Sequence, residues 1–373
     1  MKDPRFIRNI IIKALVMFII IDILFAFMNP LPALGRLSTY NGLFPGRLRL
    51  PYGDRPDLAY NLSLFNLDAM FASHEIASGR KPADEFRVVL IGDSSTWGFL
   101  LHPEETLSTL LNARGLVAPS GKEVRVFNLG YPTMSLTKDL LMLSRALRYQ
   151  PDLILWLVTL ESFPASKQLA SPIVQHNPQE VRELIGVNNL RLDADSPEFV
   201  NLTRWEQTLI GQRRAVADWF RLQLYGVLWA ATGVDQVYPE KYDPPQRNLT
   251  AEEDFYGLGP PTLNESDLAF DVLEAGVKLV GDIPVMIVNE PIYLSDGQNS
   301  DIRYNFYYPR WIFDQYRQEM RLRAEANDWL YLDLWDLVPA SEFTNSAIHL
   351  TPTGENLLAG QIARMILPLI DER

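Results

Sequence analysis

The sequence of 373 residues is 47% hydrophobic and 21% charged, which is typical of one large globular domain or two ordinary ones and unlike a disordered chain. The first fifty residues hold seven basic and two acidic side chains, a net charge of +5, whereas the whole chain carries −12. The rest of the chain therefore carries −17. An acidic body of that size repels phosphate polymers, which argues against nucleic-acid binding. The chain has no cysteine, which excludes thiol catalysis and thiolate metal sites.

A long apolar run near the N-terminus predicts a membrane anchor. Every residue from 14 to 28 is apolar except Asp22, and the run reaches back to Ile10 with only Lys13 interrupting it. A helix over residues 10–28 is about 28 Å long, close to the roughly 30 Å of a hydrocarbon core. Basic residues precede the run, so we expect a single-pass membrane protein with a cytoplasmic N-terminus and an extracytoplasmic domain. No clean Ala-x-Ala cleavage site follows, which favours an uncleaved anchor over the alternative, a removed signal peptide.

Asp22 is the one ionisable residue in the apolar run 14–28. A carboxylate in the bilayer usually faces a protein partner or a polar cavity, so Asp22 predicts a membrane partner. The alternative is a lone Asp that is protonated or snorkels toward an interface. We interpret residues 1–30 as stub and anchor, residues 31–57, which are rich in Pro, Gly and Arg, as a linker or membrane-proximal arm, and residues 58–373 as the folded domain.

Strand-like and helix-like segments alternate along the domain. Apolar runs predict strands at residues 88–91, 124–128, 153–158, 283–288 and 329–333. Helical patterns predict helices within 58–81 and over 104–113, 135–148, 266–280, 311–327 and 352–369. This order favours a central parallel sheet covered by helices on both faces, the flavodoxin-like three-layer α/β sandwich.

The alternation is interrupted at about residues 162–264 by a long insertion with helical patterns, notably over residues 205–229. We interpret the insertion as an extra lobe over the sheet edge. It is either a lid or a plain structural elaboration.

A serine directly follows the first predicted strand. Gly92, Asp93 and Ser94 end the apolar run 88–91 with residues that favour turns. A serine there lies at the carboxyl end of a central strand, where open α/β sheets bind their ligands. The alternative is that Ser94 only caps the next helix. Asp93 is expected to hold the turn rather than to react.

A serine hydroxyl needs a base within hydrogen-bond reach to act as a nucleophile. Of the four histidines, only His349 lies in the loop between the last predicted strand and the last predicted helix, at the sheet edge that carries Ser94. We therefore expect a Ser94–His349 pair, and the alternative is a structural histidine. Asn289 and Glu290 end the fourth predicted strand and are either substrate contacts or structural residues.

Three short blocks lie on this scaffold: Ile91-Gly-Asp-Ser-Ser-Thr-Trp-Gly98, Asn128-Leu-Gly-Tyr-Pro132 and His349-Leu-Thr-Pro-Thr-Gly354. They resemble the conserved blocks of the SGNH/GDSL superfamily of serine esterases and acyltransferases, over residues 86–369 without the insertion. The resemblance implies that Ser94 is the nucleophile and His349 the general base. It also implies that the N–H groups of Ser94 and Gly130 form the oxyanion hole.

The chain departs from the family pattern at two positions. The family's third block carries an Asn that completes the oxyanion hole, whereas the aligned residue is Glu161, which accepts hydrogen bonds when ionised and cannot donate one. The family usually has an Asp three residues before the histidine, where this chain has Ser346. The Ser346 hydroxyl, Glu342 or a backbone carbonyl would then orient the imidazole. Glu161 is also a candidate substrate contact.

The sequence therefore predicts a membrane-anchored, extracytoplasmic serine esterase or O-acyltransferase that acts on acyl esters of a cell-envelope polymer. The arrangement is similar to that of anchored superfamily members that act beside membrane-bound O-acyltransferases, which implies such a partner through Asp22. The alternative is a catalytically impaired binding or scaffold protein. No cofactor or metal is expected, because no glycine-rich phosphate loop follows a strand and the histidines are scattered.

Overall fold

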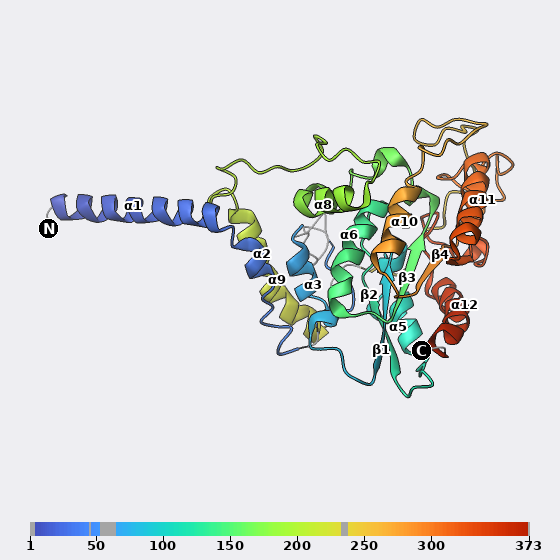
Figure 1. The fold of residues 1–373 in the computed structure, drawn as a ribbon, viewed down its shortest axis with the longest axis horizontal. Helices are drawn as coiled ribbons and strands as arrows, with labels where there is room; N and C mark the ends of the chain where they lie inside the picture. The colour runs from blue at the N-terminus through green and yellow to red at the C-terminus, as the bar shows by residue number, and fades with distance from the viewer. Residues whose placement is uncertain (1–3, 45, 53–64, 233–237, 372–373) are drawn as a thin grey trace.

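The computed structural model describes residues 4–371, except residue 45 and the segments 53–64 and 233–237. In these residues five parallel strands form one sheet in the order β2-β1-β3-β4-β5. The strands are β1 (Glu85–Ile91), β2 (Glu123–Asn128), β3 (Leu153–Val158), β4 (Val285–Asn289) and β5 (Leu330–Asp333). This order, with helices on both faces of the sheet (Figure 1), is flavodoxin-like, so the predicted fold class is confirmed.

The sheet is buried on both faces because successive strand side chains point to opposite sides. Val88 and Leu90 of β1 join one hydrophobic cluster, and Val89 and Ile91 join the other. One face is covered by two helices, α5 (Leu107–Asn112) and α12 (Pro352–Asp371). The opposite face is covered by α3 (Leu67–Ala72), α6 (Leu136–Ala146), α10 (Phe270–Leu279) and α11 (Arg310–Asn327).

The strand ends differ from the prediction by at most three residues. The helix predicted over 104–113 is divided, because Thr106 is extended (φ −71°, ψ 153°) between a 3-10 turn at Pro103–Glu105 and α5. The helix predicted within 58–81 is α3 followed by a 3-10 turn at Glu75–Ala77, and residues 58–64 lie outside the described residues. Further 3-10 turns lie at Leu147–Tyr149, Leu160–Ser162, Ala165–Lys167 and Ala340–Glu342.

The described residues of the segment interpreted as a linker or membrane-proximal arm pack in part against the domain, and residues 45 and 53–57 lie outside the described residues. We call residues 31–52 the arm; it begins with the short helix α2 (Leu31–Gly35) and buries Tyr40 and Leu50. Arg49 is 1% exposed and donates to the carbonyls of Gly98 and Leu101 at 2.8 and 3.3 Å. Arg49 thus satisfies buried backbone oxygens. The Pro, Gly and Arg composition of the segment does not reveal this role.

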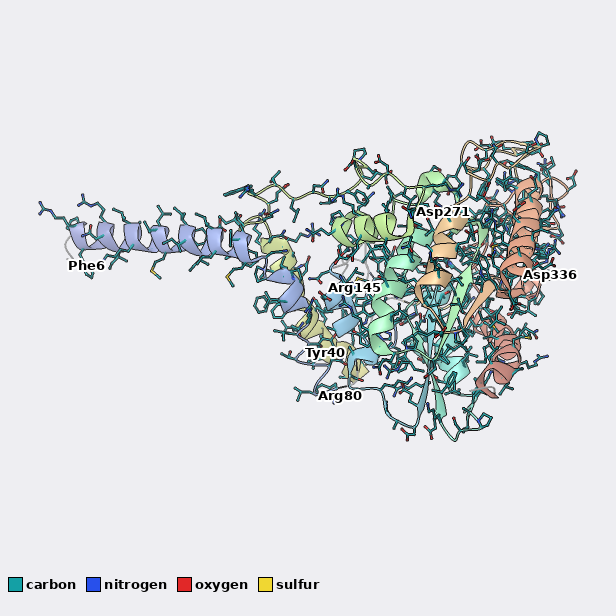
Figure 2. The ribbon with its side chains drawn as sticks, viewed as in Figure 1. Phe6, Tyr40, Arg80, Arg145, Asp271 and Asp336 are labelled. Atoms are coloured by element: carbon teal, nitrogen blue, oxygen red, sulfur yellow. The ribbon has the colours of Figure 1, made fainter. Side chains whose placement is uncertain are left out.

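Helix α1 (Pro4–Met28) extends away from the rest of the molecule (Figure 1). Its side chains are exposed, as Phe6 illustrates in Figure 2, and its most apolar window has a mean hydropathy of 2.8. By length and composition α1 can cross a membrane. Asp22 is the buried exception, at 7% exposure, because it accepts the backbone N–H of Ile210 at 2.9 Å. The partner of this carboxylate therefore lies within the chain.

The insertion contributes helices to two sides of the domain. The helices α7 (Pro172–Gln175) and α8 (Pro178–Asn188) pack on α6. The helix α9 (Arg213–Thr232) lies beside α2, near the end of α1 (Figure 1), with Gly226 against the Tyr40 ring. The longest helix of the insertion therefore packs against the arm. The stretch after α9 reaches the loop that follows the serine turn, where the Tyr242 hydroxyl donates to the Leu100 carbonyl at 3.3 Å.

Candidate active site

Ser94 is placed by a tight turn between β1 and the one-turn helix α4 (Ser94–Trp97). The Asp93 side chain caps α4 by accepting the Ser95 N–H at 2.8 Å. Gly92 allows the close approach of the two elements, since a Cβ there would lie 2.1 Å from the Thr96 hydroxyl oxygen. Ser94 is therefore held at the carboxyl edge of the sheet, as the first residue of α4.

The fold brings His349 next to this serine. Ser94 Oγ and His349 Nε2 are 2.8 Å apart, although 255 positions separate the residues in the sequence. The carbonyl of His349 accepts the Thr344 N–H at 2.9 Å, which closes the loop before α12. The Phe99 ring packs against the imidazole with ring centres 4.9 Å apart. In the tautomer with its proton on Nδ1, His349 is oriented to accept the serine proton, which is the arrangement that activates a serine.

The other ring nitrogen of His349 lacks support. Within the described part of the chain, the buried Nδ1 atom has no hydrogen-bond partner. The Ser346 hydroxyl accepts the Ile348 N–H at 3.4 Å, and Glu342 accepts the Thr351 hydroxyl at 2.5 Å, so neither side chain orients the ring as expected. Burial lowers the pKa of His349 to about 4. The imidazole is thus neutral at pH 7 and can accept a proton.

One of the two expected oxyanion donors is engaged elsewhere. No group among the described residues accepts the Ser94 N–H, whereas the Gly130 N–H donates to Asn128 Oδ1 at 3.0 Å. Gly130 matters for packing, since a Cβ there would lie 2.6 Å from the Trp97 nitrogen in α4. The Asn128 side chain also joins the end of β2 to α4, because it donates to the Thr96 carbonyl at 2.8 Å. The expectation that the Gly130 amide completes the oxyanion hole is therefore not met in this conformation.

Glu161 is paired with other side chains rather than free. Lys167 forms an ion pair with Glu161 Oε1, and the Tyr256 hydroxyl donates to the same atom. Burial first, and then the bond and charge of Glu161, raise the pKa of the Tyr256 phenol. Burial also raises the pKa of Tyr307, and the charges of Glu161 and Asp93 raise it further. Glu161 follows the end of β3, which is parallel to β1, so it lies at the same carboxyl edge of the sheet as the serine turn.

Two partners of Glu161, Lys167 and Tyr256, were not among the residues predicted for the site. Lys167 lies six residues after Glu161 and could have been found as its nearest cation in the chain. Tyr256 follows 95 positions later, inside the insertion, and no sequence pattern connects it to the site.

The two strand-end residues expected to contact substrate are structural supports. Asn289 is fully buried, and its side chain donates to Asp333 at 2.8 Å and accepts from the Tyr316 hydroxyl at 3.1 Å. It therefore joins β4 to β5 and α11. Glu290 is 1% exposed and accepts the Thr96 hydroxyl at 3.3 Å, so it supports α4 from within the core.

Three carboxyl groups, those of Asp93, Glu290 and Glu355, are buried in the domain. Burial raises the pKa of Asp93, Glu290 and Glu355, that of Glu355 to about 8, and the charge of Asp93 raises the pKa of Glu290 further. Lys138 opposes the shift at Asp93 and donates to the Gly92 carbonyl at 2.7 Å. A protonated carboxyl is far less costly to bury than a carboxylate, so Glu355 can stay in the core at pH 7. The described residues include no group of His, Asp or Glu arranged to hold a metal ion.

No protein-family model matches the chain, and no curated protein matches it in sequence. Among solved structures, the chain is similar to the lipase/acylhydrolase from Enterococcus faecalis, with 18% identity, coverage of 76% of this chain and 96% of that chain, and a TM-score of 0.36. It is similar to a member of the lipolytic G-D-S-L family from Veillonella parvula (10% identity, 74% and 96% coverage, TM-score 0.35). It is also similar to a carbohydrate acetylesterase from Sinorhizobium meliloti (13% identity, 76% and 99% coverage, TM-score 0.34). By their names, these three proteins are lipolytic hydrolases or esterases.

Proposed function

We propose that the protein is a serine esterase or acyl hydrolase that uses Ser94 and His349. The observation that carries this proposal is the 2.8 Å contact between Ser94 Oγ and His349 Nε2 at the carboxyl edge of the sheet. His349 takes the hydroxyl proton as Ser94 attacks an acyl carbonyl, and returns it to the alcohol that leaves when the tetrahedral intermediate collapses. The Ser94 N–H stabilises the oxyanion. Water, or an acceptor alcohol, then removes the acyl group from the serine.

The finer parts of the proposal concern location and substrate. Arg5, Arg8 and Lys13 lie toward the N-terminus of α1, so positive charge would retain that end in the cytoplasm and place the domain outside. We infer that the substrates are acyl esters of a cell-envelope polymer, and that the acyl group passes to water or to another alcohol. A membrane-bound acyltransferase is the candidate partner. Asp22 supports that partner less than its place in the apolar run suggested, because its Oδ1 atom already accepts the Ile210 N–H.

A binding or scaffold protein is the second candidate. The unpartnered Nδ1 of His349 favours it, because no carboxylate stabilises the imidazolium that forms when the serine is deprotonated. The ion pair of Glu161 with Lys167 favours it as well, since a paired carboxylate replaces a hydrogen-bond donor at the resembled oxyanion position.

Labelling with a fluorophosphonate probe distinguishes the two candidates. The full chain in detergent is treated with the probe beside Ser94→Ala and His349→Ala, with His102→Ala as a control histidine outside the pair. An esterase is labelled, loses the label in Ser94→Ala, loses most of it in His349→Ala and keeps it in His102→Ala. A folded parent protein that takes no label contradicts the esterase proposal and supports the binding protein.

A further inference from the structure

Helix α9 is apolar on two opposite faces. Its inward stripe is buried against the arm and consists of Leu222, Gly226 and Trp229. Its outward stripe is exposed and consists of Phe220 (59%), Leu224 (71%) and Leu228 (55%). A helix on the surface of a water-soluble domain needs one apolar face only. The second face therefore indicates a second apolar environment.

The segment before α9 is joined to α1. The N–H of Ile210 donates to Asp22, which lies six residues before Met28, so the contact is about 9 Å from the end of α1 at 1.5 Å per residue. Figure 1 shows this segment leaving the α/β layers and reaching the end of α1. A membrane that α1 crosses therefore meets residues 202–212 as well.

The side chains and backbone of residues 202–212 suit the interface of a bilayer. Trp205 is 63% exposed, and tryptophan is enriched at the level of lipid head groups. The N–H groups of Gln207, Thr208 and Gln212 donate to carbonyls within the segment, which is needed where water is scarce. Residues 202–232 hold four arginines and two acidic residues in a chain of net charge −12. This local positive charge complements anionic head groups.

We propose that residues 202–212 and the outward stripe of α9 lie in the extracytoplasmic interface of the bilayer that α1 crosses. The occupant of the apolar stripe is lipid. Trp205 lies deepest, next to the last turns of α1, and Phe220 and Leu224 lie at the level of the head groups. This inference rests on the proposed membrane anchoring of α1. Its consequence is that the insertion binds the domain to the membrane surface.

The absence of cysteine makes the test direct, because each introduced cysteine is unique. Nitroxide labels are placed one at a time at Trp205→Cys, Phe220→Cys and Leu224→Cys in the full chain, reconstituted in vesicles of phosphatidylethanolamine and phosphatidylglycerol. Collisions with oxygen, which dissolves in lipid, are compared with collisions with a water-soluble nickel complex. We expect oxygen to dominate at these three labels, most strongly at position 205.

Three further labels serve as controls. Val187→Cys on α8 and Leu322→Cys on α11 replace side chains that are 72% and 51% exposed, and nickel should dominate at both. Met17→Cys tests α1 itself. Lipid exposure at position 17 with nickel dominant at 205, 220 and 224 overturns the inference and leaves the anchor intact. Protection of the three labels from both reagents also overturns it, because the stripe is then covered by protein. Nickel access at position 17 would contradict the anchoring instead.

Discussion

The buried, unpartnered Nδ1 of His349 limits how well the serine pair can work. Proton transfer from Ser94 creates an imidazolium, which a carboxylate on the second ring nitrogen stabilises in a complete triad. Burial without such a partner lowers the pKa of His349 to about 4. Each unit below the ordinary value of 6.5 corresponds to about 1.4 kcal/mol against the protonated ring. The serine is therefore activated less than in a complete triad.

The same pKa predicts an unusual pH profile for fluorophosphonate labelling. The reaction needs a neutral His349, and a pKa of about 4 keeps the ring neutral well below pH 6.5. We expect the labelling rate to change little from pH 7 to about 5 and to fall as the pH passes through about 4. Circular dichroism over the same range separates this loss from acid unfolding. A midpoint near 6.5 in a folded protein would show that the ring is hydrated or paired.

A carboxylate placed near Nδ1 of His349 should increase the reactivity of Ser94. Ser346→Asp places an acid at the position where the resembled family carries one, and its charge would stabilise the imidazolium. We expect the labelling rate to rise roughly tenfold to a hundredfold, below the ~10⁴ that a complete triad loses with its Asp, and the acid midpoint to move upward. Asn345→Asp, at the exposed neighbouring position, is the matched control and should change neither. An unchanged rate and midpoint in Ser346→Asp would show that residue 346 does not reach Nδ1.

At the scale of elements, the serine depends on how α4 is packed. This helix has a single turn, so it is held by its Asp93 cap, by the Glu290 carboxyl and by the loop after β2. Gly130 in that loop touches the backbone of α4, which cannot move away as a flexible side chain could.

Gly130→Ala should therefore disturb both stability and labelling. The added Cβ would lie 2.6 Å from the Trp97 nitrogen, so either α4 or the loop must shift. We expect a loss of about 1–3 kcal/mol in the free energy of unfolding and a clear loss of labelling, because the serine moves relative to His349. Gly186→Ala in α8, where nothing lies within 4 Å of the added Cβ, is the control and should be neutral or slightly stabilising. Equal effects in the two variants would contradict this account of Gly130.

The helix α12 should give the domain a pH-dependent stability through Glu355. Burial raises the pKa of Glu355 to about 8, so between its ordinary 4.5 and about 8 the folded state holds a proton that the unfolded state has released. Stability therefore falls as the pH rises through this window, by up to about 1.4 kcal/mol per unit. Glu355→Gln removes this loss. We expect the drop in melting temperature from pH 6 to pH 9 to be smaller in Glu355→Gln than in the parent, and an equal drop would assign the sensitivity to other groups.

At the scale of the whole molecule, the order of the strands and helices was predictable because it follows from local sequence patterns. Apolar runs that end in turn residues marked the five strands, and the parallel topology then brought Ser94 and His349 to one edge. The position of His349 in the chain was sufficient to identify it as the partner of Ser94, because only one histidine lies between the last strand and the last helix.

The remaining features were not predictable because they depend on long-range contacts. The arm resembled a linker in composition, yet Arg49 fills a site that the loop after α4 creates with its carbonyl oxygens. Asn289 and Glu290 lie at the correct edge but point into the core, which position alone does not reveal. The engagement of the Gly130 amide with Asn128 likewise depends on side-chain orientation.

The contact of Asp22 with Ile210 should control how firmly the insertion is held. Asp22→Leu removes the acceptor of the Ile210 N–H, so residues 202–212 lose their attachment to α1. We expect trypsin to cleave after Arg204 and Arg213 faster in Asp22→Leu than in the parent, both in vesicles. Ile23→Leu, at a 60% exposed neighbouring position on α1, is the control and should be cleaved at the parental rate. Equal cleavage of all three proteins would show that this contact does not hold the segment.

The junction between α1 and the arm would determine how the proposed membrane-anchored esterase meets its substrate. Asn29, with φ 41°, ends α1, and α2 begins two residues later, while Asp22 holds the insertion to α1 on the other side of this junction. A chain anchored by a long tether sweeps its active site through a hemisphere. If α1 crosses a membrane as proposed, a chain fastened on both sides of a two-residue junction would hold its serine at a fixed height above the lipid. Substrates of the proposed esterase that are held in the same membrane would then meet the serine by lateral diffusion in two dimensions.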